Sequence, residues 1–266
     1  MTVELTVVGS INLDLVARVE HLPRPGETLA ATGFDRFPGG KGANQAVAAA
    51  RLGAHVRMIG AVGEDPLAEE ALAGLVDAGI RLELDRADET GLALIFVAAD
   101  GETQIVVAPG ANAHVVPRRV GGAVLCQLEV PDEVVLEARR DASFFALNAA
   151  PARAIDVVPD LLIVNRLEHE IVSAGALVAV TFGPEGAALY ENGREVARAV
   201  PPLVDAVDGT AAGDAFAACL VVSLLESRTR TEALERACAA GALAASRPGA
   251  QPSLPTRLDV EAILAS

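Results

Sequence analysis

The sequence has few cysteines and no apolar run long enough to cross a membrane. Its three cysteines, Cys126, Cys219 and Cys238, lie in apolar surroundings at no metal-like spacing, which excludes a disulfide framework and fits reduced, buried thiols. No apolar run approaches the ~18 residues of a membrane span, and the first residues lack a basic stretch followed by an apolar block. We therefore expect a cytoplasmic protein without a membrane partner.

Positive charge is also scarce. The chain has 21 basic and 36 acidic residues, a formal net charge of −15, and Lys41 is its only lysine. This balance argues against nucleic acid or an anionic membrane as a partner, because both would be repelled at long range. It does not exclude a nucleotide, since a local cluster of backbone amides with Mg²⁺ can outweigh a distant net charge.

What is present is an ordinary globular composition in which short apolar strands alternate with helices. The 266 residues are 52% hydrophobic and 21% charged, without a fixed-period repeat. Alternating strands and helices predict an α/β fold with a mostly parallel sheet and helices on both faces, in three α/β/α layers. We expect strands at 3–8, 55–60, 123–128, 143–147, 161–164 and 177–182, and helices at 42–52, 65–78, 132–140, 214–226, 231–246 and 256–264.

Two segments have a different character. Residues 29–37 and 92–107 are rich in β-formers, and Asp100-Gly101 divides the second into two runs. Asp-Gly between such runs is a strong hairpin signal. These segments predict a small antiparallel sheet apart from the main one.

The most informative motif is Thr210-Ala211-Ala212-Gly213-Asp214, directly before the apolar run 215–225. Small residues let a backbone pass close to a ligand, and the first amides of a helix attract an anion such as a transferring phosphoryl group. A carboxylate beside that anion can accept the proton of an attacking hydroxyl. The alternative is that Asp214 only caps the helix.

A second motif, residues 39–45 (Gly-Gly-Lys-Gly-Ala-Asn-Gln), opens the first helix. Lys41 and Asn44 near the helix start form a donor cluster for hydroxyls or phosphate, although a glycine pair is often only turn chemistry. The Gly-x4-Gly-Lys-Ser/Thr spacing of a P-loop is absent.

Polar residues also follow two predicted buried strands. Asn12 and Asp14 come after the first strand, and Glu129 ends the strand at 123–128. Ligands of parallel sheets bind beyond the carboxyl ends of the strands, where a carboxylate can accept two neighbouring sugar hydroxyls. The alternative at each position is a turn-stabilising side chain.

Taken together, these motifs resemble the ribokinase-like PfkB family of sugar kinases along the whole chain. The resemblance implies one ribokinase-like kinase domain over residues 1–266, with a lid formed by about 11–38 and 90–109. The stretches that carry the resemblance are 8–14, 39–49 with Arg51, 90–97, 109–113, 127–129, 147–153, 165–168, 181–186, 208–216 and 248–253.

The resemblance implies ATP-dependent phosphorylation of D-ribose at its 5-hydroxyl. Asp214 would then be the general base, and the amides of Ala211, Ala212 and Gly213 would form an anion hole. The sugar would be held by Asn12, Asp14, Gly40, Lys41, Asn44 and Glu129, together with Asp214. The antiparallel segments would form a lid that often serves as a dimer interface in the family, so a homodimer is expected.

The resemblance also implies sites for ATP, Mg²⁺ and a monovalent cation, usually K⁺. An Asn-x-x-Glu element, Asn165 and Glu168, would lie near Mg²⁺ and phosphate, acting through water. The nucleotide site would be shaped by Thr181, Gly183, Pro184, Glu185, Gly186, Gly213 and Cys238. The cation would be held by Asp208, Thr210, Ala244, Arg247, Gly249 and Ser253.

The chain departs from the family pattern in being short. Helical connections are trimmed between Pro117 and Ala123, between Pro151 and Leu161, and after Glu170. Only residues 165–176 separate two strands expected to be parallel, close to the ~10–12 residues such a crossover needs. We expect a subunit contact or a rearranged loop to cover the sheet there.

Two other functions remain open. The chain could be a kinase of the same family that acts on a nucleoside or another sugar, or a sugar- or nucleotide-binding protein that has lost turnover. The Gly-Gly-Lys-Gly-Ala-Asn and Gln-Leu-Glu motifs favour ribose, and the intact Asp214, Gly213, Asn165 and Glu168 argue against the loss of catalysis.

Overall fold

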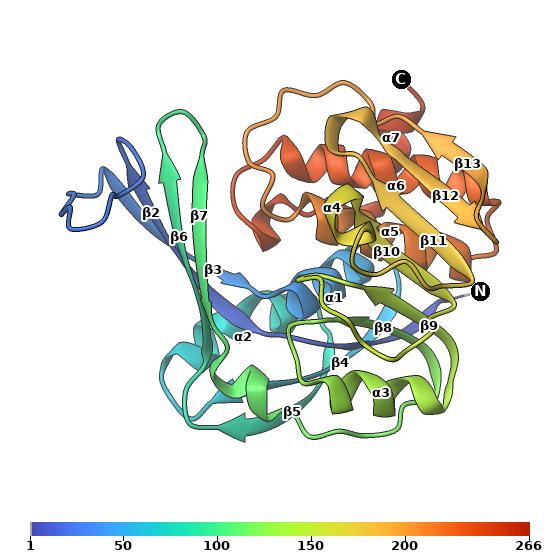
Figure 1. Ribbon diagram of the computed structural model, residues 1–266, viewed down its shortest axis with the longest axis horizontal. Helices are drawn as coiled ribbons and strands as arrows, with labels where there is room; N and C mark the ends of the chain where they lie inside the picture. The colour runs from blue at the N-terminus through green and yellow to red at the C-terminus, as the bar shows by residue number, and fades with distance from the viewer. Residues whose placement is uncertain (1) are drawn as a thin grey trace.

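A nine-stranded sheet forms the centre of the computed structural model, which describes residues 2–266 (Figure 1). The strand order is β13-β12-β11-β10-β9-β8-β1-β4-β5, parallel from β11 to β5 and antiparallel only at the β12–β13 edge. The strands are β1 (Glu4–Val8), β4 (His55–Gly63), β5 (Arg81–Ala87), β8 (Gly122–Gln127), β9 (Ala142–Asn148), β10 (Leu161–Asn165), β11 (Leu177–Thr181), β12 (Ala187–Glu191) and β13 (Arg194–Ala199).

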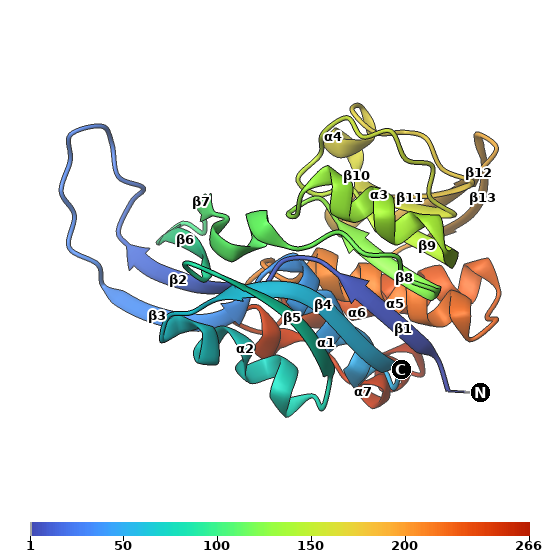
Figure 2. The same cartoon turned by 90° about the horizontal axis from the view of Figure 1, so that it is seen from below.

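Helices cover both faces of this sheet, so the expected three-layer α/β/α class is confirmed (Figure 2). One face carries α1 (Lys41–Arg51), α2 (Leu67–Asp77), α5 (Ala212–Leu225), α6 (Arg230–Ala245) and α7 (Arg257–Leu264). The other carries α3 (Asp132–Arg140) and the single turn α4 (Arg166–His169). Within residues 2–266, every helix is too short or too polar to span a lipid bilayer.

The layers follow from where the apolar residues lie. The central strands are apolar on both faces, as expected for a parallel sheet covered on both sides. Helix α5 is apolar all round and buried from Asp214 to Ser223, because it packs between the sheet, α1 and α6. Because α5 is enclosed by neighbouring elements along most of its length, its first turn, which contains Asp214, is held in a fixed place.

A smaller four-stranded sheet, called the second sheet below, stands away from the main body (Figure 1). Its order is β3-β2-β6-β7, and a tight turn around Gly101 joins β6 to β7. The outer pairs are antiparallel, as expected, while the central pair β2–β6 is parallel. Its strands are β2 (Asn12–Val19), β3 (Gly33–Gly39), β6 (Gly91–Ala98) and β7 (Thr103–Ala108).

The main sheet and the second sheet share one stretch of backbone. Strand β1 ends at Val8, and after only residues 9–11 the chain enters β2. Asn12 and Asp14 therefore lie where the two sheets meet, at the carboxyl end of a central parallel strand. This is the position at which α/β proteins bind their ligands.

The trimmed connections are present as expected, since β9 and β10 are joined without a helix and β10 and β11 by α4 and a short loop. The loop covers part of the sheet face, and Val172 is buried there. It leaves a groove of ≈ 510 Å³ lined by residues that include His169, Val178, Val180 and Tyr190. A subunit contact over this groove stays a prediction.

Candidate active site

Asp214 lies in the first turn of α5 and is 5% exposed. Its Oδ2 accepts a hydrogen bond from Asn44 Nδ2 at 3.0 Å, and its Oδ1 accepts one from Gln45 Nε2 at 2.9 Å. Both donors belong to α1, which starts immediately after the glycine pair. The acid and the double-glycine motif, 170 residues apart in sequence, are thus in direct contact.

The start of α5 offers free backbone donors beside this carboxylate. No side chain caps the helix, and the amides of Ala211, Gly213 and Asp214 have no acceptor among residues 2–266. The Ala212 amide already donates to Gly209 O at 3.2 Å, so it is engaged within the turn. The free amides and the helix dipole favour an anion at this position.

The glycine pair permits a close approach between α1 and the strand–strand junction. Gly40 has φ 86°, and a side chain there would meet the backbone of residues 10–12 at about 3 Å or less. A Cβ on Gly39 would lie 2.2 Å from the Asp14 carboxylate oxygens. Only glycine therefore brings the start of α1 next to Asp14.

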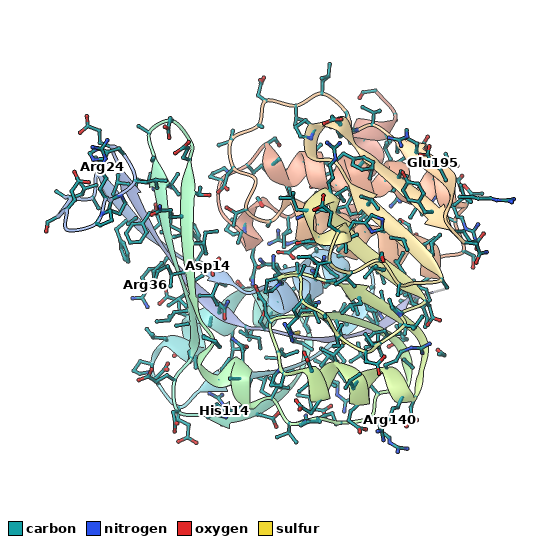
Figure 3. All side chains as sticks on the ribbon, in the orientation of Figure 1. Asp14, Arg24, Arg36, His114, Arg140 and Glu195 are labelled. Carbon is teal, nitrogen blue, oxygen red and sulfur yellow. The ribbon has the colours of Figure 1, made fainter. Side chains whose placement is uncertain are left out.

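Asn12 and Asp14 are held at the base of the second sheet, both buried. Figure 3 shows Asp14 where this sheet meets the main body, whereas Arg24 lies on its distal loop. Asn12 Oδ1 accepts from Asn112 Nδ2 at 2.7 Å, and a Cβ on Gly91 would lie 2.3 Å from the same oxygen. The carbonyl end of the Asn12 amide is thus occupied by protein.

Glu129, directly after β8, reaches the same junction from the other side. Its Oε2 accepts from Ser10 Oγ at 2.5 Å and from the Lys41 amide at 3.2 Å. The structure thus brings Asn12, Asp14, Gly40, Lys41, Asn44, Glu129 and Asp214 to one place, from β2, α1, β8 and α5.

The charges in this cluster act on one another. Burial, reinforced by Glu129 and Asp214, raises the pKa of Asp14 to about 7, although Lys41 opposes the shift. Burial alone would lower the pKa of Lys41, but the carboxylates of Asp214, Glu129, Glu168 and Asp14 outweigh it and raise that pKa. Burial also raises the pKa of Asp214 against the pull of Lys41 and the two amide donors. The positive charge of Lys41 thus offsets part of the negative charge of several nearby carboxylates.

The expected Asn-x-x-Glu element lies at the end of β10. Asn165 caps α4: its Oδ1 accepts from the Glu168 amide at 2.8 Å, and Glu168 Oε2 accepts from the Asn165 amide at 2.8 Å. The reciprocal pair satisfies two helix-end amides, as a capping box does. It leaves Asn165 Nδ2 and Glu168 Oε1 for other partners.

Most of the expected nucleotide-site residues gather around the β11–β12 turn and α6, whereas Gly213 lies at the start of α5. Gly183, Pro184 and Glu185 form a short 3₁₀ turn after Thr181, and Gly186 follows with φ 98°. A Cβ on Gly186 would lie 2.1 Å from Ala199 O, the same oxygen that Cys238 Sγ approaches at 3.8 Å. Cys238 is buried on α6, so the turn and the helix meet at one point.

The expected cation-site residues come from two loops that hydrogen bonds join. Asp208 Oδ2 accepts from the Gly249 amide at 2.9 Å, and its Oδ1 accepts from the Thr210 amide at 3.0 Å. The amide of Asp208 donates to Ala245 O at 3.0 Å, next to Ala244. Ser253 Oγ is buried and donates to Ala250 O at 2.8 Å, while Arg247 pairs with Asp259.

Comparison with known proteins decides the family. The model of the pfkB family carbohydrate kinases matches residues 3–150 and 132–257, nearly the whole chain. The chain belongs to the pfkB family of carbohydrate kinases. It is 37% identical over 291 residues to a ribokinase of Bacillus subtilis, covering 98% of this chain and 99% of that one. It is 32% identical over 295 residues to a deoxyribokinase of Salmonella typhi, covering 95% and 96%.

Solved structures agree with this assignment to the pfkB family. A ribokinase from Thermotoga maritima superposes with a TM-score of 0.87 at 32% identity, covering 100% of both chains. An Arabidopsis thaliana ribokinase, solved in complex with ribose and ATP, superposes with a TM-score of 0.86 at 28% identity, also covering 100% of both.

Several buried polar residues around this pfkB-family site were not expected from the sequence. Gln45 donates to Asp214, Gln127 and Asn148 each bond to Gln45, and Asn112 holds Asn12. Each lies inside or beside a motif that carries the resemblance. Their place at a motif boundary or a strand end was the only available signal, because one sequence does not show which buried polar groups meet.

Proposed function

We propose that this protein transfers the γ-phosphoryl group of ATP to the 5-hydroxyl of D-ribose. The observation that carries the proposal is the contact of Asp214 with Asn44 at the mouth of an uncapped helix. It places a proton acceptor, hydroxyl-binding groups and anion-binding amides together, which a phosphoryl transfer to an alcohol requires.

In the reaction, the ribose 5-oxygen attacks the γ-phosphorus while its proton passes to Asp214 Oδ2. The bond from the γ-phosphorus to the β,γ-bridging oxygen breaks, and ADP leaves. The free amides of Ala211, Gly213 and Asp214 stabilise the charge on the transferring group, with Ala212 shaping the turn. A buried carboxylate with a raised pKa is a better proton acceptor than an exposed one, and Lys41 offsets its charge.

The sugar is held on the side of the second sheet. Asp14 accepts two neighbouring ring hydroxyls, and Asn12 donates from its Nδ2, because Asn112 occupies its oxygen. Lys41, Asn44 and Glu129 contact the remaining hydroxyls, and the Gly39–Gly40 backbone lets the ring approach closely. Neighbouring hydroxyls of a furanose match this set of acceptors and donors.

ATP lies between the β11–β12 turn and the start of α5, with Thr181, Gly183 to Gly186, Gly213 and Cys238 around it. Residues 2–266 contain no cluster of three or more metal-ligating side chains. Mg²⁺ usually keeps several waters and binds the phosphates of its substrate with one or two carboxylates. Glu168 and Asn165 would hold such a hydrated ion through water, and the ion would supply charge neutralisation.

A monovalent cation, K⁺, would be held between the loops of Asp208 and Gly249. The donor set, a carboxylate of Asp208, the hydroxyls of Thr210 and Ser253, and backbone carbonyls of Ala244, Arg247 and Gly249, consists of the hard oxygen ligands that such an ion prefers. The hydrogen bond from Gly249 to Asp208 keeps the two loops at one distance. The cation would add positive charge close to the anion-binding turn.

The second sheet acts as a lid over the sugar and as the contact of a homodimer. Its strand β7 is an outer strand exposed along its whole length, and Ile105 and Val106 are 55% and 57% exposed. Open edges with apolar side chains tend to pair with another chain.

The cytoplasm is the compartment that supplies ATP and keeps the three free thiols reduced.

A coupled assay of ADP release tests this function. Purified protein with ATP, Mg²⁺ and K⁺ is compared on ribose, 2-deoxyribose, fructose and adenosine. We expect turnover with ribose, its reduction without K⁺, and its loss by at least about 10³-fold in Asp214→Asn, because the amide cannot accept the proton.

Other outcomes of this assay identify the alternatives. Turnover on adenosine alone would point to a nucleoside kinase of the same fold, and preference for 2-deoxyribose to a deoxyribose kinase. Ribose binding in calorimetry without any ADP release would point to a non-catalytic binding protein.

A further inference from the structure

A chain of buried side-chain amides connects the central sheet to Asp214. Gln45 on α1 is fully buried at 0% exposure, although glutamine is usually a surface residue. Gln127 of β8 and Asn148 of β9 lie beside it, both buried. None of the three belongs to the sugar, nucleotide or cation contacts proposed above.

The orientation of these amides is set by a backbone carbonyl. Asn148 Nδ2 donates to Ile163 O of β10 at 3.1 Å. Because a carbonyl oxygen only accepts, the Asn148 amide must turn its nitrogen toward Ile163 and its oxygen toward Gln45. Gln45 must then present its nitrogen to Asn148, and it does so at 2.9 Å.

The second N–H of Gln45 is the one that meets the acid. Gln45 Nε2 donates to Asp214 Oδ1 at 2.9 Å, and Gln45 Oε1 accepts from Gln127 Nε2 at 2.6 Å. Rotating the Gln45 amide by half a turn would place its oxygen against two acceptors and its nitrogen against a donor. The arrangement around Asp214 therefore has one stable orientation.

We infer that Gln45 is a positioning residue for Asp214: by fixing Oδ1 from the inner side, it leaves Oδ2 facing Asn44 and the sugar. The inference rests on the proposed function, since it concerns which oxygen of the base meets the substrate hydroxyl. A carboxylate held at one oxygen by a rigid donor cannot rotate away from the hydroxyl, and such alignment contributes directly to rate.

Other charged groups near Asp214 do not replace this donor. Lys41 and Asn44 belong to the sugar side of α1, while Glu129 and Asp14 add negative charge. Burial raises the pKa of Asp214, and the donors from Asn44 and Gln45 together with Lys41 hold it down. Without the Gln45 donor, Asp214 will keep its proton to a higher pH.

The test is the pH profile of ribose phosphorylation in Gln45→Met, which keeps the size of the side chain and removes both donors. At saturating ribose and ATP we expect kcat at pH 7 to fall about 10- to 100-fold, since a hydrogen bond to a charged group is lost. The acid limb of kcat should move up by about one pH unit. The KM for ribose should change by less than about 3-fold, since the sugar contacts remain.

Ser223→Ala is the matched control, because it removes a buried group from the same helix α5. Ser223 Oγ accepts from Arg236 Nε at 3.3 Å and does not touch Asp214. This variant should lower the melting temperature and keep the wild-type acid limb. If Gln45→Met does not fold, Gln45→Glu has the same shape, and its acid limb should also move up.

Three outcomes separate the ideas. An acid limb unchanged in a folded Gln45 variant overturns the positioning role while the kinase function stands. A fall in kcat/KM caused only by a higher KM for ribose also overturns it. Absence of ribose-dependent turnover in the wild-type protein overturns the proposed function, and the positioning role with it.

Discussion

Among single residues, Asp14 is the one whose burial in the folded protein disfavours its negative charge. Burial raises its pKa to about 7, so the folded protein keeps a proton on Asp14 that the unfolded chain releases near the ordinary aspartate pKa of 3.8. The folded state therefore binds more protons between these values, and the free energy of unfolding falls as pH rises through this range. A bound sugar whose hydroxyls donate hydrogen bonds to Asp14 would favour the ionised carboxylate and lower its pKa again.

Asp14→Asn should therefore stabilise the protein above pH 7 while it weakens sugar binding. We expect the melting temperature at pH 8 to rise by about 5–10 °C relative to the wild-type protein, and the difference to shrink toward pH 4.5. The KM for ribose should rise about 10- to 100-fold for each hydrogen bond lost. Calorimetric melting at the two pH values and initial rates measure both effects.

Asp88→Asn is the control for this prediction, since it removes the same charge from an exposed position. It should leave both the melting temperature and the KM close to wild type. An Asp14→Asn protein that is less stable than wild type at pH 8 would show that the buried carboxylate contributes to folding.

The sequence was informative about the acid and the helix-start residues of its motifs and poor for buried side chains that contact only other side chains. The resemblance carried by the motifs at 39–45 and 210–214 implied that Lys41, Asn44 and Asp214 belong to one site, and the structure brings Asn44 to Asp214. Gln127 and Asn148 escaped notice because a buried amide is recognised only by the atom opposite, and this atom comes from a distant segment. Asn165 and Glu168 form the capping box that their spacing also allows.

Among the elements, α1 begins so close to the backbone that follows β1 that there is no room for a side chain at its second residue. Its second residue, Gly42, faces the end of β1, and a Cβ there would lie 2.6 Å from the carbonyl carbon of Gly9 and 2.7 Å from the Ser10 amide nitrogen. Gly42→Ala should push the start of α1 away and displace Lys41 and Asn44 from the sugar. We expect a loss of about 1–3 kcal/mol in the free energy of unfolding and a higher KM for ribose.

Urea unfolding and initial rates measure these effects, with Gly121→Ala as the matched control. Nothing lies within 4 Å of a Cβ on Gly121, so this variant should behave as the wild type. Helix propensity alone predicts that Gly42→Ala stabilises α1 by about 1 kcal/mol. A more stable Gly42→Ala protein would thus contradict the contact.

Long helices, whether marked by periodicity, by a cap or by an unbroken apolar run, were predicted closely, and polar or short strands were not. The helices α1, α3, α5 and α6 lie within two residues of the expected bounds. Strand β5 was missed because it lies at the sheet edge and alternates charged with apolar residues, and β12 and β13 because their pairing across Asn192-Gly193 is set by β11. Strand β2 was expected only as part of the lid region.

On the scale of the whole molecule, the exposed apolar side chains of strand β7 lead us to predict that the protein forms a dimer through this strand. Ile105→Lys places a charge in the proposed dimer contact, where a buried charge without a partner is costly. We expect the wild-type protein to be a dimer in sedimentation or light scattering and the variant to shift toward monomer, by at least about 10-fold in the dissociation constant.

Thr103→Lys on the same strand and the same face is the control, because Thr103 is exposed and polar. It should leave the dimer largely intact if Ile105 supplies the apolar contact. A wild-type protein that is monomeric at all concentrations, or an Ile105→Lys protein that dimerises as tightly as wild type, argues against this surface.

The shared backbone of β1 and β2 has a mechanical consequence. Residues 9–11 join the parallel body to the protruding sheet along this stretch of backbone. If the protruding sheet swings, Asn12 and Asp14 travel with it, whereas Asp214 stays anchored in α5. Opening would thus move the product away from Asp214 and expose it to water in one motion. Closing would bring the next sugar to Asp214 with its hydroxyl already aligned.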